Sequence, residues 1–168
     1  MTESLADDPR DPADGVATFD VAAPTSRDAA WCLGRYYAEI DDRFQEGFAV
    51  EHSLVPDAGE FTPPHGVFLV ARLRGTPVGC GALKLRGTGP ADVKRMWVDP
   101  AVRGLGVGRR LLAELEAQAA NRGVRTVQLE TNRVLEEAIA LYRSSGYIEV
   151  EAFNEEHYGD HWFRKQLG

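Results

Sequence analysis

The residues with the clearest chemical pattern form the turn Arg103-Gly104-Leu105-Gly106-Val107-Gly108, between an extended run at 93–98 and a helix-like stretch that continues to Leu115. The first N–H groups of a helix have no partners inside the helix, and the helix dipole adds roughly half a positive charge at that end. Glycines let these amides approach a bound anion closely, because no Cβ stands between them. We therefore predict that this turn binds a diphosphate.

Three kinds of glycine loop could account for this turn, and the flanking residues separate them. The dinucleotide-binding loop G-x-G-x-x-G, counted from Gly104, meets Arg109 where its last glycine should stand. A P-loop ends in G-K-[ST], whereas Gly108 is followed by a pair of arginines. The pattern that fits is V-x-x-x-x-[QR]-x-x-G-x-[GA], with its specified positions at Val98, Arg103, Gly106 and Gly108. A plain turn that merely joins a strand to a helix is the remaining alternative.

A second pattern lies further along the chain. It reads A-x-x-L-Y-x-x-x-G-[FY], and its specified residues are Ala138, Leu141, Tyr142, Gly146 and Tyr147. In this order, the two patterns resemble the acetyl-CoA-binding signature and the second acetyl-CoA-contacting segment of the GNAT superfamily of N-acetyltransferases. The resemblance covers residues 66–150 well and the N-terminal third only by the order of its elements.

The resemblance implies that acetyl-CoA is the cofactor, and it implies a set of contacts on this chain. The implied cofactor-binding residues are Met96, Trp97, Val98, Arg103, Gly104, Leu105, Gly106, Val107, Gly108, Arg109, Asn132 and Tyr142. Arg103, Arg109 and Arg110 are expected to be exposed cations that strengthen anion binding modestly. One position departs from the family, because many members have an asparagine seven residues before the tyrosine and this chain has Leu135.

The reaction that the resemblance implies is direct transfer of the acetyl group from the thioester to an amine. Tyr142 matches the family's general acid, which protonates the departing thiolate; a core tyrosine is its structural alternative. A backbone N–H near Trp97 or Val98 is suited to stabilise the developing oxyanion, since a fixed amide needs no reorganisation.

The base that deprotonates the amine is less clear from the sequence. Many relatives have a carboxylate or a histidine on the strand before the glycine turn, but this chain has Lys94 and Arg95 there. Both are cations at neutral pH and poor bases unless their pKa values are strongly shifted. Glu130 is the best carboxylate for the role. A strand-edge salt bridge is its structural alternative, and a water chain could replace a single base.

The acceptor is predicted to be a primary amine of a small molecule. In the superfamily, the first helix and the loop after it form part of the acceptor wall, so Tyr37, Phe44 and Phe48 are candidate substrate contacts; a core face is their structural alternative. Two other functions stay open, namely acetylation of a protein lysine or N-terminus, and a catalytically silent acyl-CoA-binding module. The presence of Tyr142 favours an enzyme.

The elements that must position these residues follow from hydrophobic periodicity and turn residues. We expect strands at residues 16–21, 66–73, 78–85, 91–98, 124–131, 147–150 and 162–166, and helices after Thr25, after the glycine turn and at residues 135–145. Thr25 is the expected N-cap of the first helix, and Leu105 belongs to the apolar stripe of the second, which Gly123 ends.

The expected fold class is mixed, between α/β and α+β. The β-α-β order around the second helix makes the strands at 91–98 and 124–131 parallel. A mixed sheet of about 6–7 strands with helices on both faces follows, and the resemblance implies that this central sheet is splayed at those two strands.

Composition is that of a soluble globular protein, with 43% hydrophobic and 27% charged residues. The formal net charge of −7 disfavours nucleic acid as a partner. Residues 1–15 are rich in acids and proline and are expected to form a flexible leader before a single domain at 16–168.

The cellular setting is inferred from what the sequence lacks. No run of residues is apolar enough to span a membrane, and no signal peptide is recognisable, so we expect a cytoplasmic protein without a membrane partner. Cys32 and Cys80 have neither metal nor redox spacing and are expected to be small buried residues in a reducing compartment. No metal site is expected, and a homodimer is compatible with the resemblance.

Overall fold

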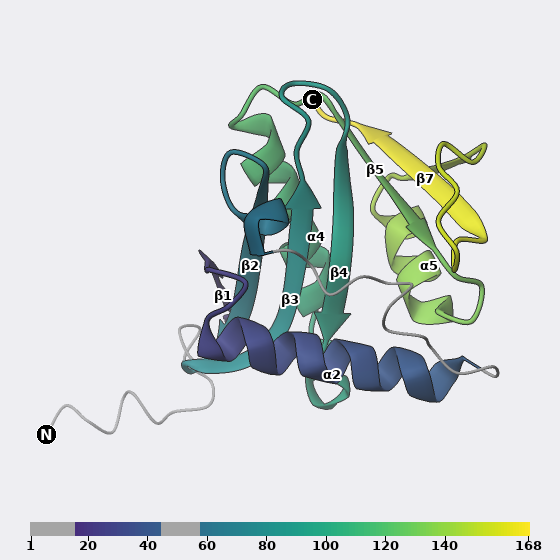
Figure 1. The fold of residues 1–168 in the computed structure, drawn as a ribbon. Helices are drawn as coiled ribbons and strands as arrows, with labels where there is room; N and C mark the ends of the chain where they lie inside the picture. Colours follow the sequence, from purple (N-terminus) through teal and green to yellow (C-terminus); the bar gives the residue numbers. More distant parts are fainter. Residues whose placement is uncertain (1–15, 45–57) are drawn as a thin grey trace, which may run out of the picture.

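The computed structural model describes residues 16–44 and 58–168, which build one seven-stranded sheet with helices on both faces (Figure 1). The strands lie in the order β1-β2-β3-β4-β5-β7-β6. Their bounds are β1 Thr18–Val21, β2 Gly66–Leu73, β3 Thr76–Lys84, β4 Ala91–Val98, β5 Thr126–Thr131, β6 Ile148–Val150 and β7 His161–Gln166. The mixed sheet predicted from the sequence is therefore confirmed, with a strand number in the expected range. The leader predicted at residues 1–15 lies outside the described residues.

Neighbouring strands are antiparallel except for β4 and β5. Arg74 and Gly75, in the turn between β2 and β3, have φ values of 52° and 79°, the left-handed conformations that a two-residue hairpin turn requires. The chain then reaches β5 through helix α4, Val107–Ala120, which returns it to the other end of the sheet. Such a crossover makes β4 and β5 parallel, as the sequence predicted.

The two parallel strands are paired only at their first residues. The backbone partners are Ala91 with Val127 and Asp92 with Gln128, and Gln128 Nε2 also donates to Asp92 Oδ1 at 2.9 Å. Beyond this point the strands diverge, and the gap widens toward the C-terminal end of β4 (Figure 1). This is the splayed pair that the resemblance implied.

A bulge in β4 changes which way its side chains point. Against β3, the pairing jumps from Cys80 with Trp97 to Ala82 with Lys94, so β4 holds an extra residue. Val93 packs into the core on the α4 side, while Trp97 packs into the core on the opposite side. Strict alternation would have placed residues 93 and 97 on the same face. The extra residue therefore reverses the alternation just before the strand reaches the glycine turn.

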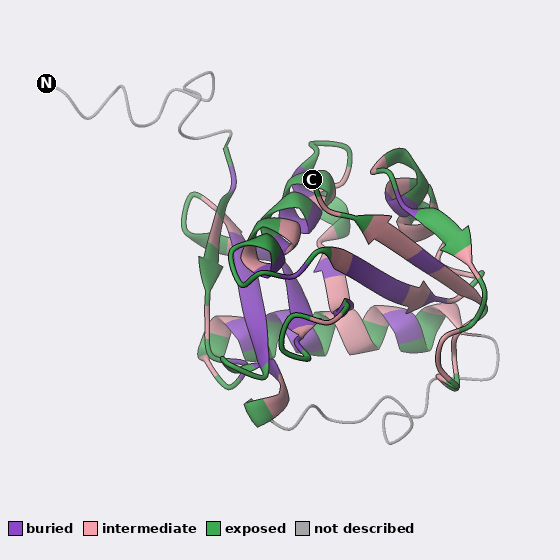
Figure 2. Ribbon diagram, turned by 90° about the horizontal axis from the view of Figure 1, so that it is seen from above, coloured by how far each residue is buried: buried purple, intermediate pink, exposed green. Residues whose placement is uncertain are grey.

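The helices cover the two faces of the sheet unequally. Helix α2, Arg27–Arg43, crosses one face, whereas α4 and α5, Glu136–Ser144, lie against the other (Figures 1 and 2). Two short 3-10 helices, η2 Ala58–Phe61 and η3 Pro100–Val102, complete the described elements. Ser26, and not Thr25, is the N-cap of α2, since its side chain accepts a hydrogen bond from the Ala29 N–H at 3.3 Å. The predicted cap was therefore wrong by one residue.

The core occupies both faces of the sheet, as strand β2 shows most clearly. Val67 and Leu69 pack with α4, while Phe68 and Val70 pack with α2, and all four are buried. A strand buried on both faces is apolar throughout, which explains why the stretch 66–71 shows no polar alternation. Leu105 was expected in the apolar stripe of α4 but is 70% exposed, because the helix begins only at Val107.

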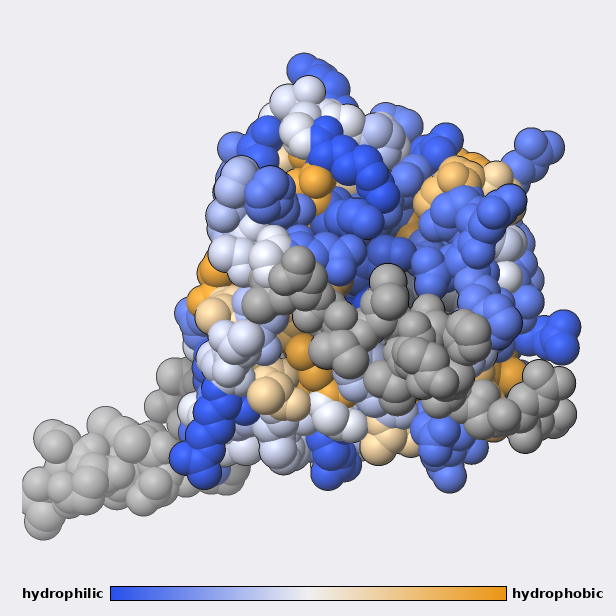
Figure 3. Space-filling view, in the orientation of Figure 1, coloured by the Kyte–Doolittle hydropathy of each residue, from blue (hydrophilic) through white to orange (hydrophobic). Residues whose placement is uncertain are grey.

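Beyond the reach of α2, the same face of the sheet carries two arginines with hydrogen-bond partners. Arg86 donates to Asp92 at 2.7 Å, and Arg164 donates to the Gln128 side chain at 2.9 Å. Figure 3 shows a largely hydrophilic surface on this side toward the top of the molecule. Within the described residues, no helix is long and apolar enough to cross a membrane. Cys32 and Cys80 are both free thiols and buried, as predicted.

Candidate active site

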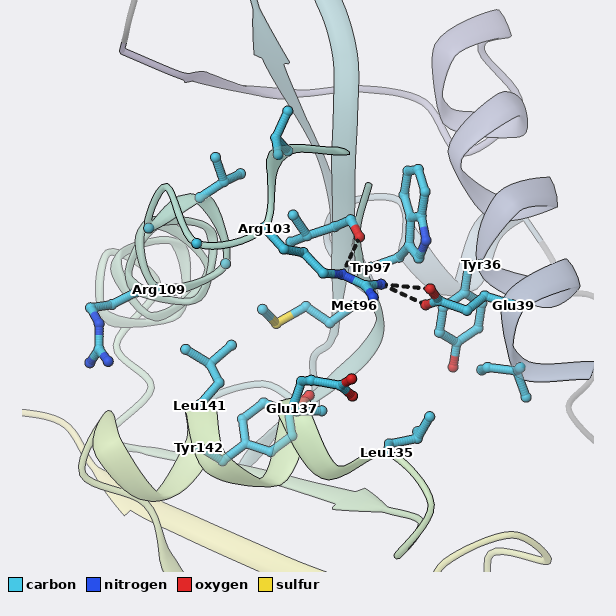
Figure 4. A pocket seen from close by; sticks show the side chains of 18 of the residues that line it. Tyr36, Glu39, Met96, Trp97, Arg103, Arg109, Leu135, Glu137, Leu141 and Tyr142 are labelled. Carbon is cyan, nitrogen blue, oxygen red and sulfur yellow. Dashed lines mark hydrogen bonds and ion pairs between the residues drawn. The ribbon is translucent and has the colours of Figure 1, made fainter. Parts of the chain in front are cut away.

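A cavity of about 420 Å³ lies where α2, the end of β4, the glycine turn and α5 meet (Figure 4). Most of the residues predicted to bind the cofactor line it. They are Met96, Trp97, Val98, Arg103, Gly104, Gly106, Val107, Gly108, Arg109 and Tyr142. The structure therefore brings together in one space two sequence patterns that are separated in the chain by α4 and β5.

Two of the predicted cofactor contacts do not line this cavity. Leu105 points into solvent. Asn132 donates to the Tyr158 carbonyl at 2.9 Å and accepts from the Val134 N–H at 3.0 Å, so its side chain fixes the turn before α5. Leu135, the residue that departs from the family pattern, does line the cavity and puts an apolar side chain there.

The glycine turn has the backbone that an anion site needs. Gly104 and Gly106 have φ values of 90° and 81°, and a Cβ built on either would meet nothing within 4 Å. Both glycines also line the cavity. Gly106 is the N-cap of α4 and caps it with no side-chain hydrogen bond, so the first turn of the helix keeps its donors for a ligand. These residues fit a diphosphate.

Gly108 is small for a different reason than the one the sequence suggested. A Cβ at this position would lie 3.3 Å from Leu141 Cδ2 and 3.5 Å from Val98 Cγ2. Gly108 therefore lets α4 pack closely against α5 and β4, which sets the width of the cavity between the two helices.

Arg103 is not the exposed cation that was predicted. Its Nε donates to the Val98 carbonyl at 3.0 Å, and its Nη2 donates to both carboxylate oxygens of Glu39 at 2.7 Å (Figure 4). The side chain thus ties α2 to the glycine turn across the cavity. Its charge is already paired, so it adds less to anion binding than a solvent-exposed arginine would.

The other two arginines also have structural partners. Arg110 turns away from the site, donates to the Ala17 carbonyl at 3.1 Å and stacks over the Phe19 ring. Arg109 is exposed and lines the cavity, but its guanidinium donates to the carbonyl and hydroxyl of Ser144 at 3.1 and 2.8 Å. It therefore joins the start of α4 to the end of α5.

A second ion pair joins α2 to α5. Arg43 donates to the two oxygens of Glu137 at 2.6 and 3.2 Å, and the Arg43 hydrogen bond is the main cause that lowers the pKa of Glu137 to about 2. Glu39, Arg43 and Glu137 all line the cavity, and the sequence analysis missed all three. The only sequence signal was the spacing of Glu39 and Arg43, four residues apart on one face of a helix.

Tyr142 has the environment of a proton donor. It is 7% exposed and packs near the rings of Tyr147 and Phe163, with ring centroids 6.0 and 6.1 Å away. Burial raises the pKa of its hydroxyl, and the negative charge of Glu130 raises it further. Among the described residues, its hydroxyl has no hydrogen-bond partner. A buried, protonated and unpartnered hydroxyl at a cavity wall is suited to a ligand that accepts a hydrogen bond.

Tyr36 faces the same cavity from α2, and sequence reasoning did not single it out. Burial raises the pKa of its hydroxyl, while the nearby charge of Arg95 opposes this effect. The tyrosine predicted in this role, Tyr37, does not line the cavity; its hydroxyl accepts from Arg95 Nε at 3.2 Å. Phe44 also lies outside the lining and packs on Tyr158 with ring centroids 4.9 Å apart. Phe48 falls outside the described residues.

Glu130 forms the salt bridge that was its structural alternative. Its side chain is 7% exposed and accepts hydrogen bonds from Lys94 and, at 3.3 Å, from Asn154. It does not line the cavity, although its charge reaches the Tyr142 hydroxyl. The carboxylate thus lies near the proposed acid, in the gap between β4 and β5, with a cation beside it.

Comparison with known proteins places this geometry in a family. Residues 33–147 match the acetyltransferase (GNAT) family. The chain is 38% identical over 116 residues to the IAA acetyltransferase of Azospirillum brasilense, covering 68% of this chain and 76% of that protein. It is 42% identical over 94 residues to the N-alpha-acetyltransferase RimI of Mycobacterium tuberculosis, covering 54% of this chain and 58% of that one.

Solved structures give the same answer. A Klebsiella pneumoniae protein, provisionally assigned to the acyl-CoA N-acyltransferases, superposes with a TM-score of 0.75 and 31% identity over 92% of this chain and 99% of its own. The family match covers most of the chain and spans the glycine turn, the splayed strands and Tyr142. The protein is therefore an acetyl-CoA-dependent N-acetyltransferase and belongs to the GNAT family.

Proposed function

We propose that this enzyme acetylates a primary amine of a small molecule by direct attack of the amine on the thioester. The observation that carries the proposal is the cavity itself. On one side it has the start of α4, which no side chain caps, and on another the Tyr142 hydroxyl, which has no partner among the described residues. The similarity to a protein named IAA acetyltransferase supports a small-molecule acceptor.

Binding of the donor falls to the glycine turn. Acetyl-CoA supplies the activated acetyl thioester. The amides at the start of α4 hold an anion there, since Gly104 and Gly106 leave the backbone accessible. Met96, Leu135 and Leu141 line the cavity with apolar side chains and exclude water from its walls.

Proton transfer is the task of two residues on opposite sides of the splayed strands. The amine nitrogen gains a bond to the acetyl carbon and loses a proton, while the sulfur loses its bond to that carbon and needs a proton. Tyr142 donates to the sulfur: a tyrosine hydroxyl is protonated at neutral pH, and burial raises the pKa of this one further. Glu130 accepts the proton of the amine, and Lys94 and Asn154 hold its carboxylate in place.

Acetylation of a protein N-terminus is the second candidate. It rests on the 42% identity to a protein named N-alpha-acetyltransferase RimI, over 54% of this chain. The experiment that separates the two candidates is thiol release from acetyl-CoA with a panel of small primary amines and of peptides with free N-termini. Turnover with small amines at kcat/KM above that for the peptides supports the proposal. Turnover with peptides alone would replace it, and no turnover with either would favour a binding module.

A further inference from the structure

Two tyrosine hydroxyls belong to the lining of the cavity, and neither has a hydrogen-bond partner among the described residues. One is the hydroxyl of Tyr142, which the proposed reaction already uses. The other is the hydroxyl of Tyr36, to which the proposed reaction gives no role. Buried polar groups in native proteins nearly always have partners, so an unpaired hydroxyl at a cavity wall is suited to hydrogen bonding with a ligand.

The surrounding structure holds the Tyr36 ring in a fixed position. The ring packs against the buried cluster that contains Trp97 and lies edge-on to the Tyr37 ring, with centroids 5.3 Å apart. One helical turn further along α2, Glu39 accepts from Arg103 at 2.7 Å, which ties this part of the helix to the glycine turn. The Tyr36 hydroxyl is therefore held at a set position relative to the residues that bind the donor.

The two hydroxyls approach the same space from opposite sides. Figure 4 shows Tyr36 entering the cavity from α2 and Tyr142 entering it from α5. Burial is the main cause that raises the pKa of the Tyr36 hydroxyl; the charge of Arg95 opposes this effect, and Tyr142 raises the pKa further. Because such an influence falls with distance, the two hydroxyls lie near one another. Both are protonated at neutral pH and can donate a hydrogen bond.

The chemistry of the cavity separates the donor from the acceptor. The glycine turn lines the cavity together with both tyrosines, whereas Glu130, the proposed base for the amine, does not line it. The Tyr36 hydroxyl is therefore on the side of the thioester and not on the side of the amine. A thioester presents two atoms to hydrogen-bond donors, the sulfur and the carbonyl oxygen. Since Tyr142 is assigned to the sulfur, the carbonyl oxygen is the atom left for Tyr36.

We propose that the Tyr36 hydroxyl donates a hydrogen bond to the acetyl carbonyl oxygen of the donor and stabilises the negative charge that develops there. This inference rests on the direct attack proposed above. As the amine nitrogen bonds to the acetyl carbon, an electron pair of the carbonyl moves to the oxygen, and it returns when the carbon–sulfur bond breaks. The proton stays on Tyr36 throughout. A donor held in place beforehand needs no reorganisation as the charge grows.

The test is Tyr36→Phe, which removes the hydroxyl and keeps the ring. Because the hydroxyl has no partner among the described residues, the variant should fold with little loss of stability. Its kcat should fall on the order of 10²-fold, the lower end of the cost of removing one donor from an oxyanion site. KM for the acceptor should stay within about twofold of the parent value. Coenzyme A affinity should be unchanged, since coenzyme A has no acetyl carbonyl.

Tyr37→Phe is the matched comparison, because it removes the same atom from the neighbouring ring. Tyr37 does not line the cavity, and its hydroxyl accepts from Arg95. This variant should lower kcat far less than Tyr36→Phe does. An equal fall in kcat for both variants would show a general disturbance of α2 and would overturn the proposal.

The remaining outcomes separate this inference from the proposed function. The assays use the amine or peptide that the parent enzyme turns over with the highest kcat/KM, since Tyr36 is proposed to act on the donor. A parental kcat in folded Tyr36→Phe would overturn the inference alone. A raised acceptor KM with unchanged kcat would also overturn it, because the hydroxyl would then bind the acceptor. A parent enzyme that turns over no acceptor would overturn both the proposed reaction and the inference.

Discussion

Lys94 and Glu130 form a largely buried ion pair across the gap between β4 and β5, two residues beyond the last backbone pair of these strands at Asp92 and Gln128. The two side chains continue the line of the Asp92–Gln128 side-chain hydrogen bond on the same face of the sheet. The pair therefore holds the strands at a fixed spacing where the backbone no longer does. It also gives Glu130 a role in stability as well as its proposed role as a base.

Variants of the pair can separate these two roles. If Glu130 is the base, Lys94→Met should preserve turnover and move the acidic limb of the pH–rate profile to higher pH, because a nearby cation favours the ionised carboxylate. Glu130→Gln should instead remove that limb and lower kcat on the order of 10²–10⁴-fold. Both single variants should lose stability, by less than the ~3–5 kcal/mol of a fully unpaired buried charge. Lys94→Met leaves Glu130 its hydrogen bond from Asn154. Glu130→Gln leaves Lys94 near Glu156, at 4.0 Å.

A purely structural role of Lys94 and Glu130 predicts different results. A structural role alone predicts that Lys94→Met and Glu130→Gln lower turnover by the same factor, and that the double variant recovers both stability and turnover. Chemical denaturation and pH–rate profiles on the same preparations measure both quantities.

The glycine turn is tested by a pair of variants of equal size. Gly106→Asn and Gly106→Asp both add a side chain to the turn that lines the cavity, and both residues tolerate the left-handed conformation at φ 81° better than other non-glycine residues do. Only the aspartate adds a negative charge where the diphosphate is expected. The Gly106→Asp variant should therefore bind coenzyme A at least tenfold more weakly than the Gly106→Asn variant at low salt. Calorimetry that finds equal affinities for the two variants would show that the anion binds elsewhere.

The free energy of unfolding at low pH should depend on the Arg43–Glu137 ion pair. The pKa of Glu137 is lowered from its ordinary 4.5 to about 2, so its contribution to stability is complete above pH 4.5 and is lost as the pH falls toward 2. The unfolding free-energy difference between the parent and Glu137→Gln should therefore shrink over this range. The effect should be small and reduced by salt, because the Glu137 side chain is 65% exposed.

A neighbouring residue provides the control for this pH effect. Glu136 is exposed on the same first turn of α5, and Glu136→Gln removes one carboxylate while the Arg43–Glu137 contact stays in place. An identical pH dependence in Glu137→Gln and Glu136→Gln would mean that the ion pair does not contribute to stability in solution.

The elements of the fold were predictable because their signals are local. A strand such as β2 is a short apolar run between turn residues, and Gly123 ends α4 through its own positive φ of 81°. The glycine turn likewise keeps its whole pattern within a few residues. Element ends were less accurate, as at Ser26 and Leu105, because caps depend on single hydrogen bonds.

The walls of the site were not predictable, since their contacts join distant parts of the chain. Arg103 and Glu39 are 64 residues apart, and Arg43 and Glu137 are 94 residues apart. No local pattern identifies such partners. The bulge in β4 is equally hidden, because an extra residue changes the direction of Arg95 without changing the sequence signal of the strand.

The sequence also could not tell which of the neighbouring residues Tyr36 and Tyr37 lines the cavity. Both residues belong to the aromatic stripe of α2, and their rings are only 5.3 Å apart. One lines the cavity and the other binds Arg95, a distinction that the helical period alone does not make. Helix rotation is set by the packing of Ala29, Cys32 and Leu33 against the sheet.

The most direct test of the proposed chemistry is turnover and coenzyme A affinity on one folded preparation of Tyr142→Phe. The hydroxyl has no partner among the described residues, so its removal should cost little stability, and the ring still packs near Tyr147 and Phe163. Coenzyme A affinity should be unchanged, because the glycine turn is intact. We expect kcat to fall on the order of 10²–10⁴-fold, the usual cost of losing a general acid. A kcat within about twofold of the parent enzyme, a barrier change of less than 1 kcal/mol, would contradict the role of Tyr142 as the proton donor.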